Sequence, residues 1–297
     1  MATQMSLFAI WDFSMLPNFR QWLPMLAAAS VLCALPFATA AQIMPQPGDL
    51  RPIQTADDAR GWEAVGRLDT GVSFCSATLI APDLVLTAAH CLFDDSHARI
   101  PNENLRFSAS LRNGRADAVG RIARSFIPDA YVSDDDGPTV DTVSDDVALL
   151  ELTQPVINAR VSPLQVGRRG RTRDLVTVVS YGRDRADYAS IEEDCAILAS
   201  QLPIQILSCN AVPGTSGAPI LRETGAGVEV IGVVSAIGEW NDDDATFAVA
   251  IDDILPALMA EYESTRRGFF GGTSAGVRSL SVGNGGRDTI GARFIRP

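Results

Sequence analysis

Three residues far apart in the chain have the side chains needed for nucleophilic catalysis: His90, Asp146 and Ser216. A serine hydroxyl is a weak nucleophile at neutral pH and needs a neighbouring base, which is usually a histidine. A carboxylate then holds the imidazole in the correct tautomer and stabilises its protonated form. The chain therefore contains the components of a serine-hydrolase site, provided that the fold brings them together.

The local sequence around each residue strengthens this interpretation. His90 lies in CSATLIAPDLVLTAAHC, Asp146 in SDDVALLEL and Ser216 in CNAVPGTSGAPI. Glycines 214 and 217 flank the serine and permit a tight turn. In such a turn the N–H groups of Gly214 and Ser216 point at one spot, which predicts an oxyanion hole.

The composition excludes other chemistries. All 24 basic residues are arginine, so a lysine nucleophile, a Schiff base and a phosphate-loop lysine are excluded. The only histidines are His90 and His97, which excludes a zinc site of three histidines. A net charge of −12 argues against a nucleic-acid-binding body, which needs a basic face. Both histidines precede Ser216 and residue 218 is alanine, whereas the α/β-hydrolase fold needs a later histidine and a G-x-S-x-G elbow.

The motifs TAAHC, DDVALL and PGTSGAP, in this order, resemble those of the chymotrypsin-like (trypsin-fold) serine proteases, and the fit is nearest to the bacterial V8-like branch. The similarity covers roughly residues 62–264. It implies an all-β fold of two six-stranded antiparallel β-barrels with a C-terminal helix and an active site in the cleft between the barrels. It also implies His90 as general base, Asp146 as orienting carboxylate and Ser216 as nucleophile. Asp145 competes for the carboxylate role, but Asp146 directly precedes the apolar run VALL and matches the family.

The same resemblance assigns a substrate pocket to Asn210, Ser235, Ala236 and Ile237. Asn210 falls at the pocket base and offers no charge partner for arginine or lysine. Glutamate-specific members use a histidine just before the position of Ser235, where this chain has Val234. We therefore expect an uncharged, small or medium aliphatic P1 residue, the residue on the amino side of the cleaved bond.

Residues 1–40 are predicted to be a secretory signal peptide. The apolar run Trp22–Ala40 follows Arg20 and ends in an A-x-A cleavage pattern. A membrane anchor is the alternative, but the run contains two prolines and no later apolar stretch reaches 18 residues. Both Met1 and Met15 stay open as the start. We expect a secreted or periplasmic protein with no stable membrane anchor after signal cleavage.

Removal of the leader would leave four cysteines, Cys75, Cys91, Cys195 and Cys209. An even number in an exported chain indicates two disulfides, and four cysteines allow three pairings. The local pairing closes two short loops, one in each half of the chain. The family resemblance implies the bond between Cys75 and Cys91, which flanks the histidine.

Short apolar strands separated by turn residues indicate two similar halves. The strands expected in the first half are Val65–Leu68, Phe74–Ile80, Leu84–Thr87, Leu105–Ser108, Ala118–Phe126 and Val147–Leu152, and those in the second are Leu175–Tyr181, Cys195–Leu198, Ile204–Ser208, Ala218–Arg222, Val228–Ile237 and Phe247–Ile251. One helix is expected at Asp252–Glu263. The expected domains are 1–40 signal peptide, 41–61 loose N-terminal segment or short pro-peptide, 62–165 first barrel, 172–264 second barrel with the helix, and 265–297 flexible Gly/Ser/Arg-rich tail.

Charge separates the tail from the body. From Ala41 to Thr265, 17 arginines stand against 34 acidic residues, and from Arg266 onward 6 arginines stand against one. These counts give −17 for the body and +5 for the tail. The tail is expected either to contact the acidic body or an anionic envelope surface, or to be a disordered extension with no specific role. The acidic clusters Asp134–Asp136, Glu192–Asp194 and Asp242–Asp244 lack the ordered spacing of a calcium site and are expected in solvated loops, as is His97.

The sequence therefore predicts a monomeric serine endopeptidase. It would hydrolyse protein or peptide substrates through an acyl-enzyme, without a cofactor or a metal and without a nucleic-acid partner. Two alternatives stay open: a catalytically inactive binding module on the same fold, and an esterase that uses the same site.

Overall fold

The computed structural model describes residues 50–133, 137–270 and 292–295. The predicted signal peptide, both candidate start residues, the acidic cluster Asp134–Asp136 and most of the predicted tail lie outside these ranges. No helix within the described ranges is long and apolar enough to cross a membrane.

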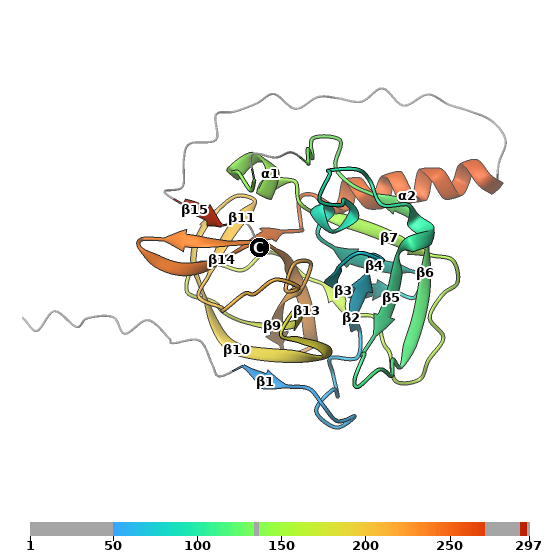
Figure 1. Ribbon diagram of the computed structural model, residues 1–297, viewed down its shortest axis with the longest axis horizontal. Helices are drawn as coiled ribbons and strands as arrows, with labels where there is room; N and C mark the ends of the chain where they lie inside the picture. The colour runs from blue at the N-terminus through green and yellow to red at the C-terminus, as the bar shows by residue number, and fades with distance from the viewer. Residues whose placement is uncertain (1–49, 134–136, 271–291, 296–297) are drawn as a thin grey trace, which may run out of the picture. The chain divides into compact units, whose positions relative to one another are not determined.

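Six antiparallel strands close into a first barrel in the order β2-β3-β4-β7-β6-β5 (Figure 1). They are β2 (Val65–Asp69), β3 (Phe74–Ala81), β4 (Leu84–Thr87), β5 (Arg106–Ala109), β6 (Ala118–Phe126) and β7 (Ala148–Leu152). Leu79, Phe107 and Leu149 are fully buried in its core. Burial of a side chain of this size contributes about 1.5–3 kcal/mol relative to exposure.

A second ring of six antiparallel strands follows in the chain. Its members are β9 (Leu175–Gly182), β10 (Arg185–Gln201), β11 (Ile204–Leu207), β12 (Pro219–Thr224), β13 (Gly227–Trp240) and β14 (Asp243–Ala250). They pair in the order β10-β11-β14-β13-β12-β9, and β9 also pairs with β10, which closes the ring. Helix α2 (Leu255–Phe270) comes next. The predicted fold class is confirmed.

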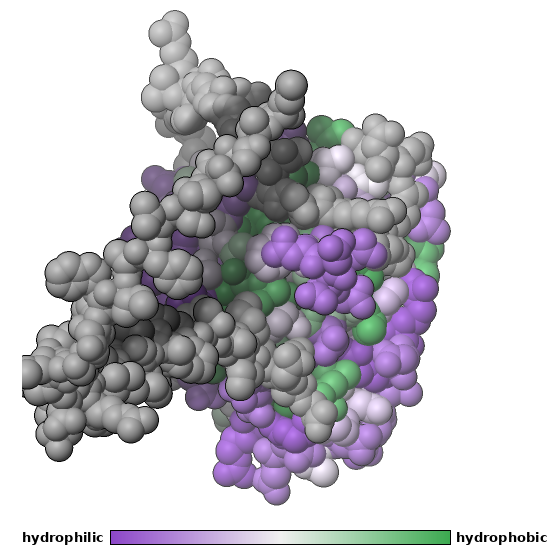
Figure 2. All heavy atoms as spheres, turned by 90° about the vertical axis from the view of Figure 1, so that its left-hand side faces the viewer, coloured by the Kyte–Doolittle hydropathy of each residue, from purple (hydrophilic) through white to green (hydrophobic). Residues whose placement is uncertain are grey.

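Several short elements were not expected from the sequence. These are β1 (Arg51–Pro52), η1 (Ala89–Leu92), η2 (Asn102–Asn104), α1 (Val140–Ser144), β8 (Gln165–Val166) and β15 (Ala292–Ile295). The hairpin of β13 and β14 is also longer than expected, because Asn241 and Asp242 both take positive φ, 55° and 68°, and form a two-residue turn. Residues 241–244 are exposed, as expected for the acidic cluster there, but Asp243 and Asp244 belong to β14 and not to a loop. Figure 2 shows large hydrophilic patches on this side of the molecule, with smaller hydrophobic patches between them.

The N-terminal segment is not loose over its whole length. Arg51 and Pro52 pair with β10, and Ile53 and Ala59 are buried in the core. The backbone N–H of Ile53 donates to the carbonyl of Ala189 over 2.8 Å. The expectation of a loose segment is therefore wrong for residues 50–61, because two apolar side chains dock there; residues 41–49 lie outside the described ranges.

Helix α2 also extends beyond its expected end at Glu263. An ion pair of 3.0 Å joins Arg267 to Glu263 one turn earlier, and the Arg266 guanidinium donates to the Tyr262 hydroxyl over 2.6 Å. Cationic side chains at a helix C-terminus are favoured by the helix dipole. The first residues of the predicted tail are therefore helical.

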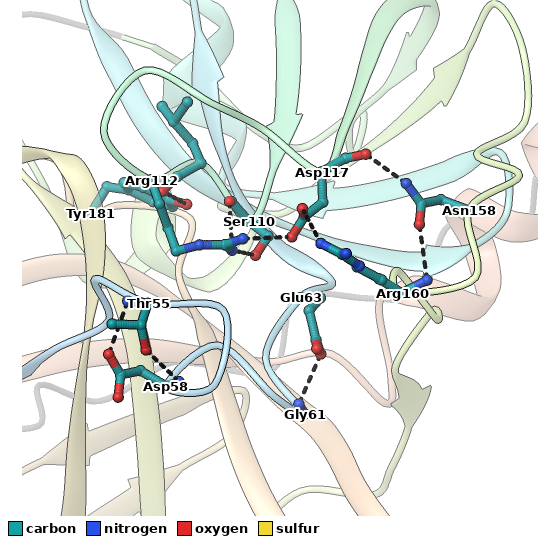
Figure 3. Close-up of polar contacts among 11 residues, drawn as sticks. Thr55, Asp58, Gly61, Glu63, Ser110, Arg112, Asp117, Asn158, Arg160 and Tyr181 are labelled. Carbon is teal, nitrogen blue, oxygen red and sulfur yellow. Dashed lines mark hydrogen bonds and ion pairs between the residues drawn. The ribbon is translucent and has the colours of Figure 1, made fainter.

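A polar network ties the connection between the barrels to the first barrel (Figure 3). Asp117 accepts from Arg112 over 3.0 Å, and its carbonyl accepts from the Asn158 side chain over 2.6 Å. From the second barrel, the buried Tyr181 hydroxyl donates to the carbonyl of Leu111 over 3.1 Å. These contacts fix the barrels against each other where the chain passes between them.

Replacement of Tyr181 by phenylalanine is expected to lower the free energy of unfolding by about 1–3 kcal/mol, since the buried Leu111 carbonyl loses its donor. Thermal or urea unfolding measures this loss. Tyr188→Phe is the matched control, because among the described residues no hydrogen bond of the half-buried Tyr188 hydroxyl is recorded. Equal losses in the two variants would contradict the role of the Tyr181 hydroxyl.

Candidate active site

A buried carboxylate organises the centre of the site. Oδ1 of Asp146 accepts from the backbone N–H of His90 over 2.8 Å, and Oδ2 lies 2.7 Å from His90 Nδ1. Oδ2 also accepts from the Ser235 hydroxyl over 2.5 Å. Asp146 is 3% exposed, whereas the His90 side chain is 31% exposed. The carboxylate is thus enclosed by donors while the imidazole stays accessible.

The local folds explain how His90 and Asp146 meet. Strand β4 ends at Thr87, and the short helix η1 immediately after it carries His90. The adjacent Cys91 is bonded to Cys75 of β3, which holds η1 against the barrel. Asp146 lies between α1 and β7. Strand β7 pairs antiparallel with β4, so the start of β7 lies beside the end of β4. The segment before β7 and the segment after β4 therefore meet at the same end of the barrel.

The pKa of His90 is raised above its ordinary value of 6.5. Burial by itself lowers this pKa, because it disfavours the charged imidazolium. The charge of Asp146 and the hydrogen bond to it act in the opposite direction and prevail. The site therefore favours a protonated His90 more than water does, which suits a base that must take up a proton during a reaction.

Ser216 lies in a tight turn that leads into β12. Gly214 and Gly217 both have positive φ, 98° and 78°, which are the left-handed conformations expected of glycine. A Cβ on Gly217 would lie 2.2 Å from Thr87 Oγ1 and 3.1 Å from the nitrogen of Ala88. Because Ala88 is two residues before His90, this contact places the serine turn directly against the histidine segment.

Within the described ranges, the two amides predicted to form an oxyanion hole donate to no protein acceptor. The carbonyl of Pro213 accepts from the N–H of Arg183 over 2.7 Å, so the trans peptide directs the N–H of Gly214 away from Arg183. Among the described residues, no acceptor is recorded for the N–H of Gly214 or Ser216. Donors left without a partner in a tight turn are available to an oxygen that carries developing charge.

The structure brings His90, Asp146 and Ser235 into direct contact, and it brings the Ser216 turn beside them. Within the described residues, no hydrogen bond joins the Ser216 hydroxyl to His90. Without substrate, catalytic hydrogen bonds are often long and tighten only when substrate is bound. The carboxylate that contacts the His90 imidazole and raises its pKa is Asp146, one residue after Asp145.

Sequence reasoning missed Ser76, a buried serine in β3. Its hydroxyl donates to the carbonyl of Gly214 over 2.9 Å and accepts from the N–H of Tyr181 over 2.8 Å. Its backbone N–H donates to the carbonyl of Ser216 over 2.9 Å. Ser76 therefore clamps the serine turn of one barrel to a strand of the other. The only signal in the sequence is a polar residue within an apolar strand, which is not specific.

The four residues expected to form a substrate pocket differ in their exposure. Asn210 is exposed, and its backbone N–H and side-chain NH₂ both donate to Glu192, over 3.0 and 2.9 Å. Glu192 is 2% exposed and belongs to β10, so the expectation of a solvated loop is wrong for this residue. Burial raises the pKa of Glu192, and the Asn210 hydrogen bonds oppose that shift. A buried carboxylate thus lies directly behind the expected pocket base.

The other three residues expected in the pocket follow one another on β13. Ser235 and Ala236 are buried, and Ile237 is half-buried. The family resemblance predicted a role for the Ser235 backbone, whereas the structure shows a contact of its hydroxyl with Asp146. Finding that contact requires the three-dimensional arrangement.

A cavity of about 480 Å³ opens beside His90 and Ser235. Its lining includes Phe93, Tyr131 and His97. His97 is half-buried and its Nδ1 lies 2.8 Å from the Ser133 hydroxyl, so it is not the fully solvated residue expected from the sequence. Phe93 and Tyr131 give this side of the site an aromatic wall.

Both predicted disulfides are present, Cys75–Cys91 and Cys195–Cys209. The two groups of potential metal ligands within the described residues are Cys75, His90 and Cys91, and Glu192, Cys195 and Cys209. The cysteines of both groups are oxidised, so neither group offers a thiolate to a metal.

Two comparisons place this geometry among known proteins. The profile of the trypsin family matches residues 53–258. A solved structure described as "Structure of Glu endopeptidase in complex with MPD" superimposes with a TM-score of 0.60 at 17% sequence identity, over 73% of this chain and 98% of that chain. At this identity the likeness demonstrates the shared fold.

Proposed function

The chain belongs to the trypsin family, and from this premise we propose that it is a serine endopeptidase with His90, Asp146 and Ser216 as its catalytic residues. The observation that carries the proposal is the Asp146 carboxylate, which binds both the backbone N–H and Nδ1 of His90. This arrangement keeps the proton on Nδ1 and leaves Nε2 as the acceptor.

Each residue then has a chemical task. His90 Nε2 takes the proton of the Ser216 hydroxyl while Oγ attacks the peptide carbonyl carbon. The carbonyl oxygen becomes an oxyanion that receives hydrogen bonds from the N–H groups of Gly214 and Ser216. The imidazolium returns its proton to the leaving amine as the C–N bond breaks. A water molecule then repeats the sequence on the acyl-enzyme and releases the acid.

We also propose an uncharged P1 residue and an exported protein. Asn210 is neutral, and the Glu192 carboxylate behind it already accepts two hydrogen bonds from it. Val234 stands where a glutamate-specific relative needs a histidine. Disulfides persist in oxidising compartments, which supports secretion or a periplasmic location. A peptide-library profile tests the first proposal: a strong preference for glutamate, lysine or arginine at P1 would contradict it.

Labelling with a fluorophosphonate probe tests the proposed mechanism, because the probe reacts with an activated serine. The wild-type chain is expected to form one adduct on Ser216, located by peptide mass spectrometry, and to hydrolyse a protein substrate. Ser216→Ala is expected to abolish both reactions. Ser235→Ala, which removes the serine hydroxyl bonded to Asp146, is expected to retain labelling at position 216. Labelling that persists in Ser216→Ala would refute the assignment.

The pH profile provides an independent test. His90 accepts a proton only when it is neutral, so kcat/KM is expected to rise with pH through one ionisation. Because the pKa of His90 is raised, the midpoint is expected above 6.5 in the free enzyme. A rate profile between pH 5 and 9 measures it. A midpoint below 6.5 would show that burial outweighs the charge of Asp146 and contradict the expected direction of the shift.

A further inference from the structure

The edge of β13 beside the triad is divided between two strands of the same chain. Strand β14 pairs with one edge of β13 over Gly232–Trp240. On the other edge, β12 pairs as far as Val233, and β15 (Ala292–Ile295) pairs antiparallel with residues 237–240. The gap between them on this second edge contains Ser235 and Ala236.

This gap is where an extended peptide would approach the site. Ser235 contacts the Asp146 carboxylate, and the peptide groups of Val234 are already bonded to Gly217 and Ala218 of the serine turn. An exposed sheet edge binds extended peptides by adding a strand, with main-chain hydrogen bonds supplying affinity. A substrate strand that reaches Ser216 along this edge must pair with β13 from Ser235 onward.

Strand β15 pairs with the same edge of β13. Its register joins Ile295 to Ile237, Phe294 to Gly238, Arg293 to Glu239 and Ala292 to Trp240. Ile237 is only two residues beyond Ser235, so a substrate strand of ordinary length would need residues that β15 already pairs. Two antiparallel strands cannot occupy the same backbone donors and acceptors.

Charge favours this docking. The chain from Arg266 onward has a net charge of +5 against −17 for residues 41–265. A cationic segment tethered to an acidic body has a high local concentration at the edge of β13.

We propose that segment Ala292–Ile295 is a built-in competitor of the substrate strand, so that the tail holds down the activity of the full chain and its removal raises that activity. The inference rests on the proposed endopeptidase function. It assigns a regulatory role to a segment that carries none of the catalytic residues.

Deletion of residues 292–297 tests the proposal. The shortened chain is expected to show a kcat/KM about tenfold higher than the full chain, mainly through a lower KM, because a short tethered competitor acts at an effective concentration in the millimolar range. Equal kcat/KM values for the two chains would overturn the inference, since an occupied edge must compete with substrate.

A peptide added in trans supplies the matched control. The capped peptide of sequence ARFI is expected to inhibit the shortened chain competitively. Two N-methylated forms of this peptide are compared. The first form is methylated at residues one and three, and the second form at residues two and four. In an antiparallel pair, alternate residues direct their N–H groups to the partner strand. One methylation pattern is therefore expected to abolish inhibition and the other to retain it, whereas equal inhibition by both would contradict strand pairing.

Hydrogen exchange separates this inference from the proposed function. In Ser216→Ala, deletion of residues 292–297 is expected to speed exchange of the backbone amides that β15 protects within Ile237–Trp240. This readout needs no catalysis. If neither the full nor the shortened wild-type chain hydrolyses peptides, the endopeptidase proposal fails, and unchanged exchange would independently overturn the pairing.

Discussion

Asp146→Asn is expected to lower kcat by about 10⁴-fold while the protein stays folded. Three donors converge on this carboxylate: the backbone N–H of His90, its Nδ1 and the hydroxyl of Ser235. A carboxylate has two acceptor oxygens, whereas an amide has one oxygen and an NH₂ donor. The NH₂ group would face a donor unless the His90 proton moved from Nδ1 to Nε2. In that tautomer Nε2 cannot accept the proton of Ser216.

Steady-state hydrolysis of a peptide substrate measures the effect, and circular dichroism with a melting curve checks the fold. Asp145→Asn is the matched control, since it makes the same change one residue earlier. We expect its kcat to stay within about threefold of wild type, because it leaves all three donors on Asp146 in place. A large loss in Asp145→Asn together with normal activity in Asp146→Asn would reverse the assignment of the carboxylate.

The barrels could be predicted because their strands follow a local rule. Runs such as Phe74–Ala81 and Leu84–Thr87 consist mainly of β-branched or apolar residues, and strands β2 to β7 differ from the expected ones by at most one residue at either end. The motif around His90 adds a rigid tie through Cys91, which the sequence also indicates. Where a strand is defined by its own residues, the sequence suffices.

Strand β10 shows where such reasoning stops. It runs from Arg185 to Gln201, although only Cys195–Leu198 has a recognisable apolar pattern. The acidic run Glu192–Asp194 predicts a solvated loop. Glu192 is nevertheless buried, because Asn210 from a later segment donates hydrogen bonds to its carboxylate. A distant partner decides the burial of a polar residue here, and no local pattern contains that information.

The candidate site divides in the same way. The identities of His90, Asp146 and Ser216 follow from motifs, whereas the contacts that hold them in place come from residues without one. Ser76 clamps the serine turn from the other barrel, and the hydroxyl of Ser235 adds a donor to Asp146. Both are single serines in apolar strands, and nothing in the sequence distinguishes them from serines that have no such contact. The motifs therefore predict the reactive groups, whereas the contacts that support them depend on how the barrels meet.

Gly214→Ala is expected to lower kcat by about 10²–10³-fold, the effect of losing one oxyanion donor. Gly214 has a φ of 98°, which strains any side-chain-bearing residue. A Cβ there would also lie 2.7 Å from the Phe74 ring and 3.2 Å from the nitrogen of Arg183. The turn must shift to relieve these contacts, and the N–H of Gly214 moves away from the position that a developing oxyanion occupies.

Gly227→Ala separates backbone strain from the catalytic effect. Gly227 also has a positive φ, 131°, but it begins β13 at the β12 hairpin and an added Cβ would meet nothing within 4 Å. Both variants are therefore expected to lose stability, measured by urea unfolding, while only Gly214→Ala loses kcat and reacts slowly with a fluorophosphonate. Because the probe also forms an oxyanion-like centre at Ser216, parallel losses in both assays would locate the defect in the turn. Equal kcat in the two variants would show that the N–H of Gly214 does not stabilise the transition state.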